Sequence, residues 1–138
     1  MKSKLLFCVL FTAHSLTGFA QKPAPAAIAA FEKLFPQATK VKWSKEKDDY
    51  EVNFLFAAKQ MSAVYSNSGI LKETEETITI AALPPSVTDY IKQHYTNARI
   101  KEAARITKPT GEINYEAEVN KTDLIFDATG KFIRQQKD

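Results

Sequence analysis

The sequence predicts an α+β fold: a tandem repeat of one helix plus a four-stranded antiparallel sheet, with both helices on one face of the combined sheet. Three observations support this prediction. Similar segments recur 59 to 65 residues apart, apolar residues recur once in each half at helical spacing, and alternating segments lie between turn residues. A repeat this short buries little surface alone, so we expect the copies to share one core. The paired segments are residues 31–36 with 90–95, 50–54 with 115–119, and 64–69 with 125–130.

The first 20 residues have the layout of a secretory signal peptide. Lys2 and Lys4 precede an apolar run at residues 5–11, and Gly18 and Ala20 supply small residues for cleavage after Ala20. The run is shorter than the roughly 20 residues that span a bilayer. We therefore expect an exported chain, periplasmic or secreted, with no membrane insertion after signal cleavage. Its mature part is one domain, residues 21–138, made of repeats at about 25–81 and 82–136.

Composition excludes several classes of protein. The only cysteine, Cys8, lies within the apolar run after Leu6 and Phe7, where a lipoprotein signal requires a small residue, so we expect no lipid anchor and no disulfide. Without Lys2 and Lys4, 17 basic residues remain against 16 acidic ones, a net charge of +1. Because no basic face is concentrated, we expect no nucleic-acid or anionic-membrane partner.

The first half begins with a helix near Pro25, where the missing proline N–H costs no hydrogen bond, and the helix ends before Pro36. Val41 and Trp43 alternate with polar residues, which predicts a half-buried strand. Gly69 ends a reverse turn that needs positive φ. The remaining strands are predicted at residues 50–56, 61–65 and 70–80.

The second half opens at Leu83 and repeats this order. An amphipathic helix ends near Asn97, a residue that suits a left-handed cap. Strands follow at residues 100–107, 113–119, 124–126 and 132–133, joined by turns at 108–111, 120–121 and 127–130, and residues 134–138 form a polar tail.

The sequence gives no basis for catalysis. The mature chain has no cysteine and one histidine, His94, at the predicted end of a helix. It thus lacks a nucleophile–base pair and a zinc ligand set, so we expect no enzyme activity and no cofactor. Glu73 and Glu75 share one face of a strand and could contribute to a calcium site. The favoured interpretation is a solvated charged strand that resists edge pairing.

The predicted binding site is the second face of the sheet. One face takes the helices, which leaves the other face wet and available for a protein partner. The candidate partner-binding residues on the two central strands are Glu51, Asn53, Glu116 and Glu118. They predict an exported, non-catalytic binding module, a class that includes protein inhibitors. The alternative is a periplasmic small-molecule or cation carrier that uses a groove between the halves.

Several features together resemble the PepSY-like proteins, a family of exported bacterial proteins of Bacteroidetes type that also resembles the β-lactamase-inhibitor fold. These features are the strand with Trp43, the strand at residues 50–52, the turn ending in Gly69, and the Leu83–Pro84 entry to a second helix. The resemblance implies a binding or inhibitory module and names no target. Trp43 has no aromatic counterpart near Ala103 or Ala104, so any role of the tryptophan belongs to one half.

Overall fold

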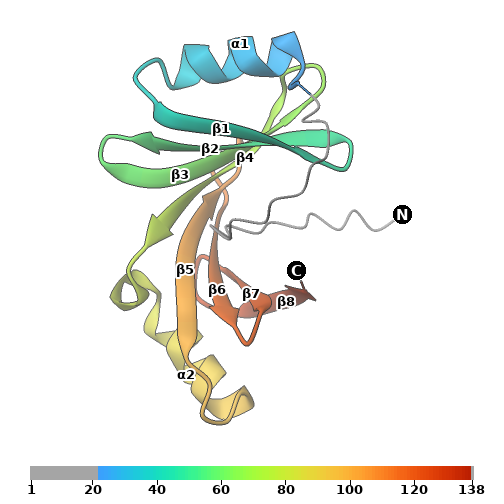
Figure 1. Cartoon of the computed structure of the whole chain (residues 1–138). Coiled ribbons are helices and arrows are strands. Elements are labelled where there is room, and N and C mark those ends of the chain that lie inside the picture. Colours follow the sequence, from blue (N-terminus) through green and yellow to red (C-terminus); the bar gives the residue numbers. More distant parts are fainter. Residues whose placement is uncertain (1–21, 138) are drawn as a thin grey trace. The chain divides into compact units, whose positions relative to one another are not determined.

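A computed structural model describes residues 22–137. The predicted signal peptide and its cleavage site lie outside these residues. The described elements follow the predicted order, with one short 3-10 helix added before the second helix (Figure 1). They are α1 (Pro25–Leu34), β1 (Thr39–Glu46), β2 (Asp49–Phe56), β3 (Lys59–Ser66), β4 (Leu71–Ile78), η1 (Ile80–Ala82), α2 (Pro85–His94), β5 (Ile100–Thr107), β6 (Ile113–Val119), β7 (Thr122–Asp127) and β8 (Phe132–Lys137).

The strands form an eight-stranded sheet whose spatial order, β1 to β8, equals the order along the chain. Antiparallel pairing joins β1 to β2, β2 to β3, β5 to β6, β6 to β7 and β7 to β8. This confirms a mixed fold of two helices and an antiparallel sheet. No helix within residues 22–137 is long and apolar enough to cross a membrane.

The chain divides into two compact units between Thr74 and Glu75, within β4. The N-terminal unit holds α1, β1, β2, β3 and the start of β4. The C-terminal unit holds the end of β4, η1, α2 and β5 to β8. This boundary precedes the predicted limit between repeats, which is at residues 81 and 82.

The N-terminal unit packs α1 on one face of its strands. Phe31 is 3% exposed, and its ring centroid lies 4.9 Å from that of Phe54 in an edge-to-face arrangement. Trp43 is only partly buried and meets the Phe31 ring at 5.5 Å, so β1 covers the edge of this cluster. The buried members of the cluster are Ala27, Phe31, Phe35, Tyr50, Val52, Phe54, Ala63 and Tyr65.

The C-terminal unit has a core of its own. Val87 and Ile91 of α2 are buried, and beside them the Tyr90 ring stacks on the Phe132 ring, with centroids 4.8 Å apart. The described buried apolar residues thus form two clusters, so the prediction of one shared core is wrong as stated. The buried members of the second cluster are Leu83, Val87, Ile91, Ala103, Ala117, Val119, Leu124 and Phe126.

Local deviations from the predicted elements have local causes. Val41 is 42% exposed instead of inward-facing, because the β1–β2 register shifts between Thr39 and Lys42. Lys40 takes φ +52° inside this irregular stretch. Ile80 belongs to η1 and not to the preceding strand, and the predicted polar tail continues β8 to Lys137.

The predicted turns are confirmed. Gly69, Gly111 and Gly130 all have positive φ, and Asn97 takes φ +56° after α2. The reversal between β6 and β7 has positive φ at Asn120 and Lys121, as a two-residue hairpin turn of type I′ requires at both of its central residues.

Candidate functional site

The candidate residues on β2 lie on the face opposite α1, as alternation predicts, but this face is not wet. Glu51 is only 6% exposed, whereas Asn53 is partly exposed. The amide Nδ2 of Asn53 donates a hydrogen bond of 2.9 Å to Oε1 of Glu51. Burial raises the pKa of Glu51 to about 7, and the charges of Glu46 and Glu73 act in the same direction. Glu51 is therefore a recessed carboxylate that takes up a proton near neutral pH.

Ser62 on β3 adds a polar group to this face. It pairs with Asn53 in the β2–β3 register, and directly opposed residues share a face. Its side chain is 1% exposed, and its Oγ has no hydrogen-bond partner among residues 22–137. The face opposite α1 therefore carries a recessed polar set, which consists of Glu51, Asn53 and Ser62. Because these residues lie on two strands, the residue pattern of one strand alone does not reveal the set.

The candidate residues on β6 are also buried. Glu116 and Glu118 are 7% and 5% exposed, so the prediction that these side chains face water is wrong. Glu116 lies between Ala104 on β5 and Ile125 on β7 in the strand register, and both of these apolar neighbours are buried. Cross-strand apolar neighbours therefore remove the Glu116 carboxylate from water.

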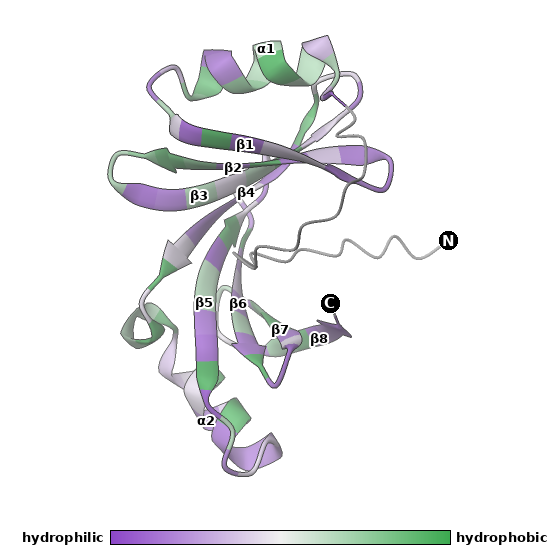
Figure 2. Cartoon of the chain, in the orientation of Figure 1, coloured by the Kyte–Doolittle hydropathy of each residue, from purple (hydrophilic) through white to green (hydrophobic). Residues whose placement is uncertain are grey.

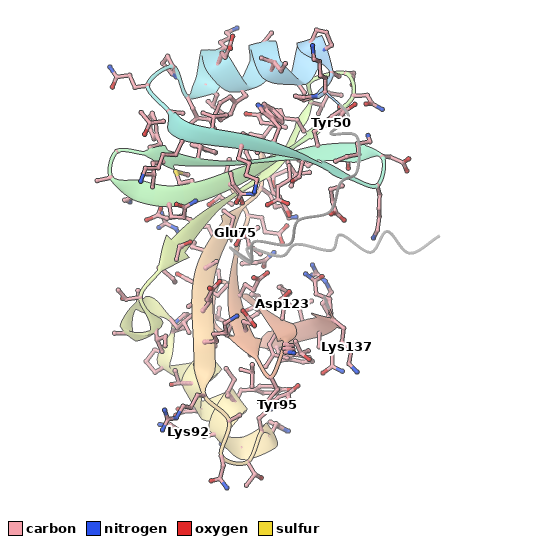
Figure 3. The ribbon with its side chains drawn as sticks, in the orientation of Figure 1. Tyr50, Glu75, Lys92, Tyr95, Asp123 and Lys137 are labelled. Carbon is pink, nitrogen blue, oxygen red and sulfur yellow. The ribbon has the colours of Figure 1, made fainter. Side chains whose placement is uncertain are left out.

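Three carboxylates line up across the C-terminal unit. Glu102 on β5 and Asp123 on β7 both pair with Glu118 on β6, which places all three on one sheet face. Asp123 is 3% exposed and is labelled in Figure 3. The Nζ of Lys101 lies 3.2 Å from Glu118 Oε1. Burial raises the pKa of Glu102, the Glu118 charge adds to this, and Lys101 opposes it. We call Glu102, Glu118 and Asp123 the carboxylate row.

The acidic segment of β4 also differs from its predicted solvated state. Glu73 and Glu75 are 3% and 2% exposed, which excludes a solvent-facing charged strand at these positions. Glu76 accepts a 2.8 Å charge-assisted hydrogen bond from Arg105 of β5. The calcium alternative gains no support, because no group of three metal-ligating side chains occurs in the described part of the chain.

His94 has a packing role in the structure. The residue is exposed at the end of α2, and its ring stacks on Tyr90 with centroids 4.2 Å apart. It therefore extends the aromatic stack that Tyr90 makes with Phe132.

The sequence contained a signal for the buried second face that the predictions missed. Three consecutive apolar residues are buried in β3, residues 63–65, and three in β7, residues 124–126. Consecutive apolar residues in a strand indicate that both faces are buried, whereas strict alternation indicates one wet face. Figure 2 shows hydrophilic and hydrophobic segments mixed along β5, so colour by residue type alone does not separate the faces. The residues missed were Ser62, Glu102 and Asp123.

The fold and these faces define an α+β protein with a helix on one side of an antiparallel sheet and recessed carboxylates on the other. The chain belongs to the PepSY-like family, whose profile, described as "Putative beta-lactamase-inhibitor-like, PepSY-like", matches residues 48–134. No curated protein matches the sequence at a significant level.

Solved structures support the same fold. A BLIP-like protein from Bacteroides fragilis is 25% identical, with a TM-score of 0.64 over 87% of this chain and 89% of that one. A protein from Bacteroides eggerthii, described as "putative periplasmic", is 17% identical, with a TM-score of 0.71 over 86% and 89% of the two chains. A domain-of-unknown-function family protein from Bacteroides uniformis is 20% identical, with a TM-score of 0.70 over 81% and 87%.

Proposed function

We propose that the chain is an exported, non-catalytic binding module that recognises a protein partner through the carboxylates on its sheet faces. The observation that carries this proposal is the carboxylate row, in which Glu102, Glu118 and Asp123 lie in register across three strands. Like charges directly opposite each other destabilise a sheet, and a buried carboxylate costs more than an exposed one. Groups kept in such an unfavourable state cluster at functional sites.

The chemistry of these faces suggests the partner's chemistry. Ionised carboxylates accept hydrogen bonds from lysine and arginine, and such bonds are about twice as strong as neutral ones. Because Glu116 and Glu118 are recessed, a slender basic side chain reaches them more readily than a flat surface does. The proposed binding residues are those of the sequence prediction: Glu51, Asn53, Glu116 and Glu118.

The comparisons support the class and the location. The family description and the BLIP-like structure favour a non-catalytic module of the inhibitor type. The B. eggerthii protein is described as periplasmic, in agreement with the export that the first 20 residues predict. We therefore place the mature chain in the periplasm or outside the cell.

Capture from the native envelope fraction tests the proposal. The mature chain, residues 21–138, is immobilised as wild type, as the quadruple variant Glu51→Gln/Asn53→Ala/Glu116→Gln/Glu118→Gln, and as the control Glu32→Gln/Asp89→Asn, which changes exposed acids on the two helices. A protein retained by wild type and control but lost from the quadruple variant supports the proposal. Equal retention by all three places the site elsewhere, at the turns that join β1 to β2 and β5 to β6. Substrate turnover abolished by one substitution overturns the non-catalytic assignment.

A further inference from the structure

A hollow lies at the turn end of the C-terminal unit, separate from the carboxylate row. It has a volume of about 450 Å³ and lies between the β5–β6 turn and the β7–β8 turn. We call it the turn cavity. The residues that define its chemistry are Glu112, Ile113, Asn114, Asp127, Thr129 and Ile133.

Each of the two carboxylates of the turn cavity is held in place by hydrogen bonds to only one of its oxygens. Oε1 of Glu112 accepts a 3.1 Å hydrogen bond from Nδ2 of Asn114, a residue that is 6% exposed. Oδ1 of Asp127 accepts hydrogen bonds from the N–H and hydroxyl of Thr129, at 2.8 and 2.7 Å, and from the N–H of Lys131 at 3.0 Å. No described residue donates to the second oxygen of either carboxylate.

The Asp127 carboxylate is stabilised in its ionised form. The hydrogen bonds from Thr129 and Lys131 lower the pKa of Asp127. No lysine or arginine is among the residues that line the cavity. The two acidic side chains of the lining therefore stand against one neighbouring lysine, Lys131, whose charge also lowers the pKa of Asp127.

The apolar part of the lining is unusual for a surface position. Ile133 is 46% exposed, one of the few large apolar side chains in the described chain with that much exposure, and Ile113 lies in the same lining. A long basic side chain buries its methylene stem against apolar surface while its charged end reaches polar groups. The two isoleucines suit the methylene stem, and the two carboxylates and the amide suit the charged end.

We propose that the turn cavity binds an arginine side chain of the protein partner. The guanidinium has five N–H donors in a fixed plane, and it can serve acceptors from several residues at once. In register, Asn114 lies opposite Asp127, so the amide oxygen and both carboxylates come from neighbouring positions at one end of the sheet. The proposal rests on the proposed function only in taking the arginine to come from a protein; the cavity itself can be tested without one.

The test is a titration of the ¹⁵N-labelled mature chain with N-acetyl-arginine amide. Binding is measured from the changes in the backbone amide chemical shifts. The matched probe is N-acetyl-citrulline amide, which has nearly the same shape and no charge. We expect saturable shifts at Glu112, Asn114, Thr129 and Ile133 with the arginine probe, and at least about fivefold weaker binding of the citrulline probe. Glu112→Gln and Ile133→Ser should each weaken the arginine probe, while the control Glu32→Gln should not.

Several results would overturn the assignment. The first is equal affinity for the arginine and citrulline probes, and the second is chemical-shift changes that appear first on β2 and central β6. The third is a Glu112→Gln chain that binds the arginine probe as tightly as the wild type does. The fourth is a higher affinity for N-acetyl-lysine amide or for calcium chloride than for the arginine probe. A melting curve confirms that each variant is folded. Failure here leaves the envelope capture result intact, and failure of the capture leaves the cavity result intact, so the two proposals are separable.

Discussion

The side-chain amide of Asn53 donates a 2.9 Å hydrogen bond to a carboxylate, Glu51, that the sheet keeps 94% out of contact with water. Burial alone favours the protonated acid, and the Asn53 hydrogen bond favours the ionised form. Burial is the larger effect, so the pKa of Glu51 rises from its ordinary value of 4.5 to about 7. The pair thus makes the stability of the N-terminal unit depend on pH.

The first prediction concerns this dependence. Between pH 4.5 and about 7 the folded chain keeps the Glu51 proton while the unfolded chain releases it, so the unfolding free energy should fall as pH rises. The contribution is complete below pH 4.5 and lost above 7, and amounts to at most roughly 3 kcal/mol. Thermal melts of Glu51→Gln across this window should show a flatter pH profile and a higher Tm at pH 8. The control Glu32→Gln should keep the wild-type profile; identical profiles for all three chains would contradict the account.

The second prediction concerns a buried hydroxyl. Tyr65 lies in the aromatic cluster under α1 and is 1% exposed, and its Oη has no hydrogen-bond partner in the part of the chain that the structure describes. Tyr65→Phe keeps the ring contacts and removes a costly unsatisfied group, so the unfolding free energy should rise by about 1 kcal/mol. Tyr95→Phe is the matched control, because Tyr95 Oη donates a 3.0 Å hydrogen bond to Gln135. That variant should be slightly less stable, and a loss of stability in Tyr65→Phe would show that its hydroxyl is satisfied.

The third prediction compares three turn glycines with nearly equal φ, at +80°, +86° and +83°. A Cβ at Gly69 would overlap the backbone oxygen of Ala26, and one at Gly130 would overlap the Ser86 side chain. One at Gly111 would meet no atom of the described residues within 4 Å. Gly111→Ala should cost about 1 kcal/mol from the backbone alone. Gly130→Ala should cost more, and Gly69→Ala the most, because a backbone atom cannot move aside as a side chain can.

A double-mutant cycle provides the control for this order. Ser86→Gly combined with Gly130→Ala should show coupling, whereas Ser86→Gly combined with Gly69→Ala should be additive. An equal loss of stability in all three alanine variants would mean that α1 and α2 do not contact these turns as described.

The fourth prediction concerns Trp43, for which full burial would imply a loss of roughly 3–5 kcal/mol on truncation to alanine. The ring is only partly buried at the edge of its cluster, so Trp43→Ala should cost less than Phe31→Ala, although tryptophan is the larger residue. Denaturant unfolding of both variants measures the order. A larger loss for Trp43→Ala would show that β1 covers the core more completely than the structure indicates.

Sequence patterns predicted the elements well because the strongest signals are local. Pro25 and Pro85 lie in the first turns of the two helices, and Ile100–Thr107 matches its predicted strand at both ends. The register shift that exposes Val41 was not predictable, because no residue in that segment requires a bulge.

The candidate site was harder to predict for a physical reason. Alternation assigns Glu51 and Glu116 to a sheet face, but their burial depends on cross-strand neighbours such as Val64 and Ile125. Glu102 and Asp123 join Glu118 only through the register of three strands, which single-strand patterns do not encode. The two core clusters likewise depend on which strands each helix covers.

The dissociation constant of the captured partner for the double variant Glu116→Gln/Glu118→Gln tests the central claim most directly. Isothermal titration should give a value at least about tenfold weaker than for the wild-type chain, equal to about 1.4 kcal/mol. The charge-matched control Glu32→Gln/Asp89→Asn should bind within about twofold of wild type, because exposed charges far from an interface contribute little. Wild-type affinity in a folded Glu116→Gln/Glu118→Gln chain would contradict recognition through the carboxylates of the sheet.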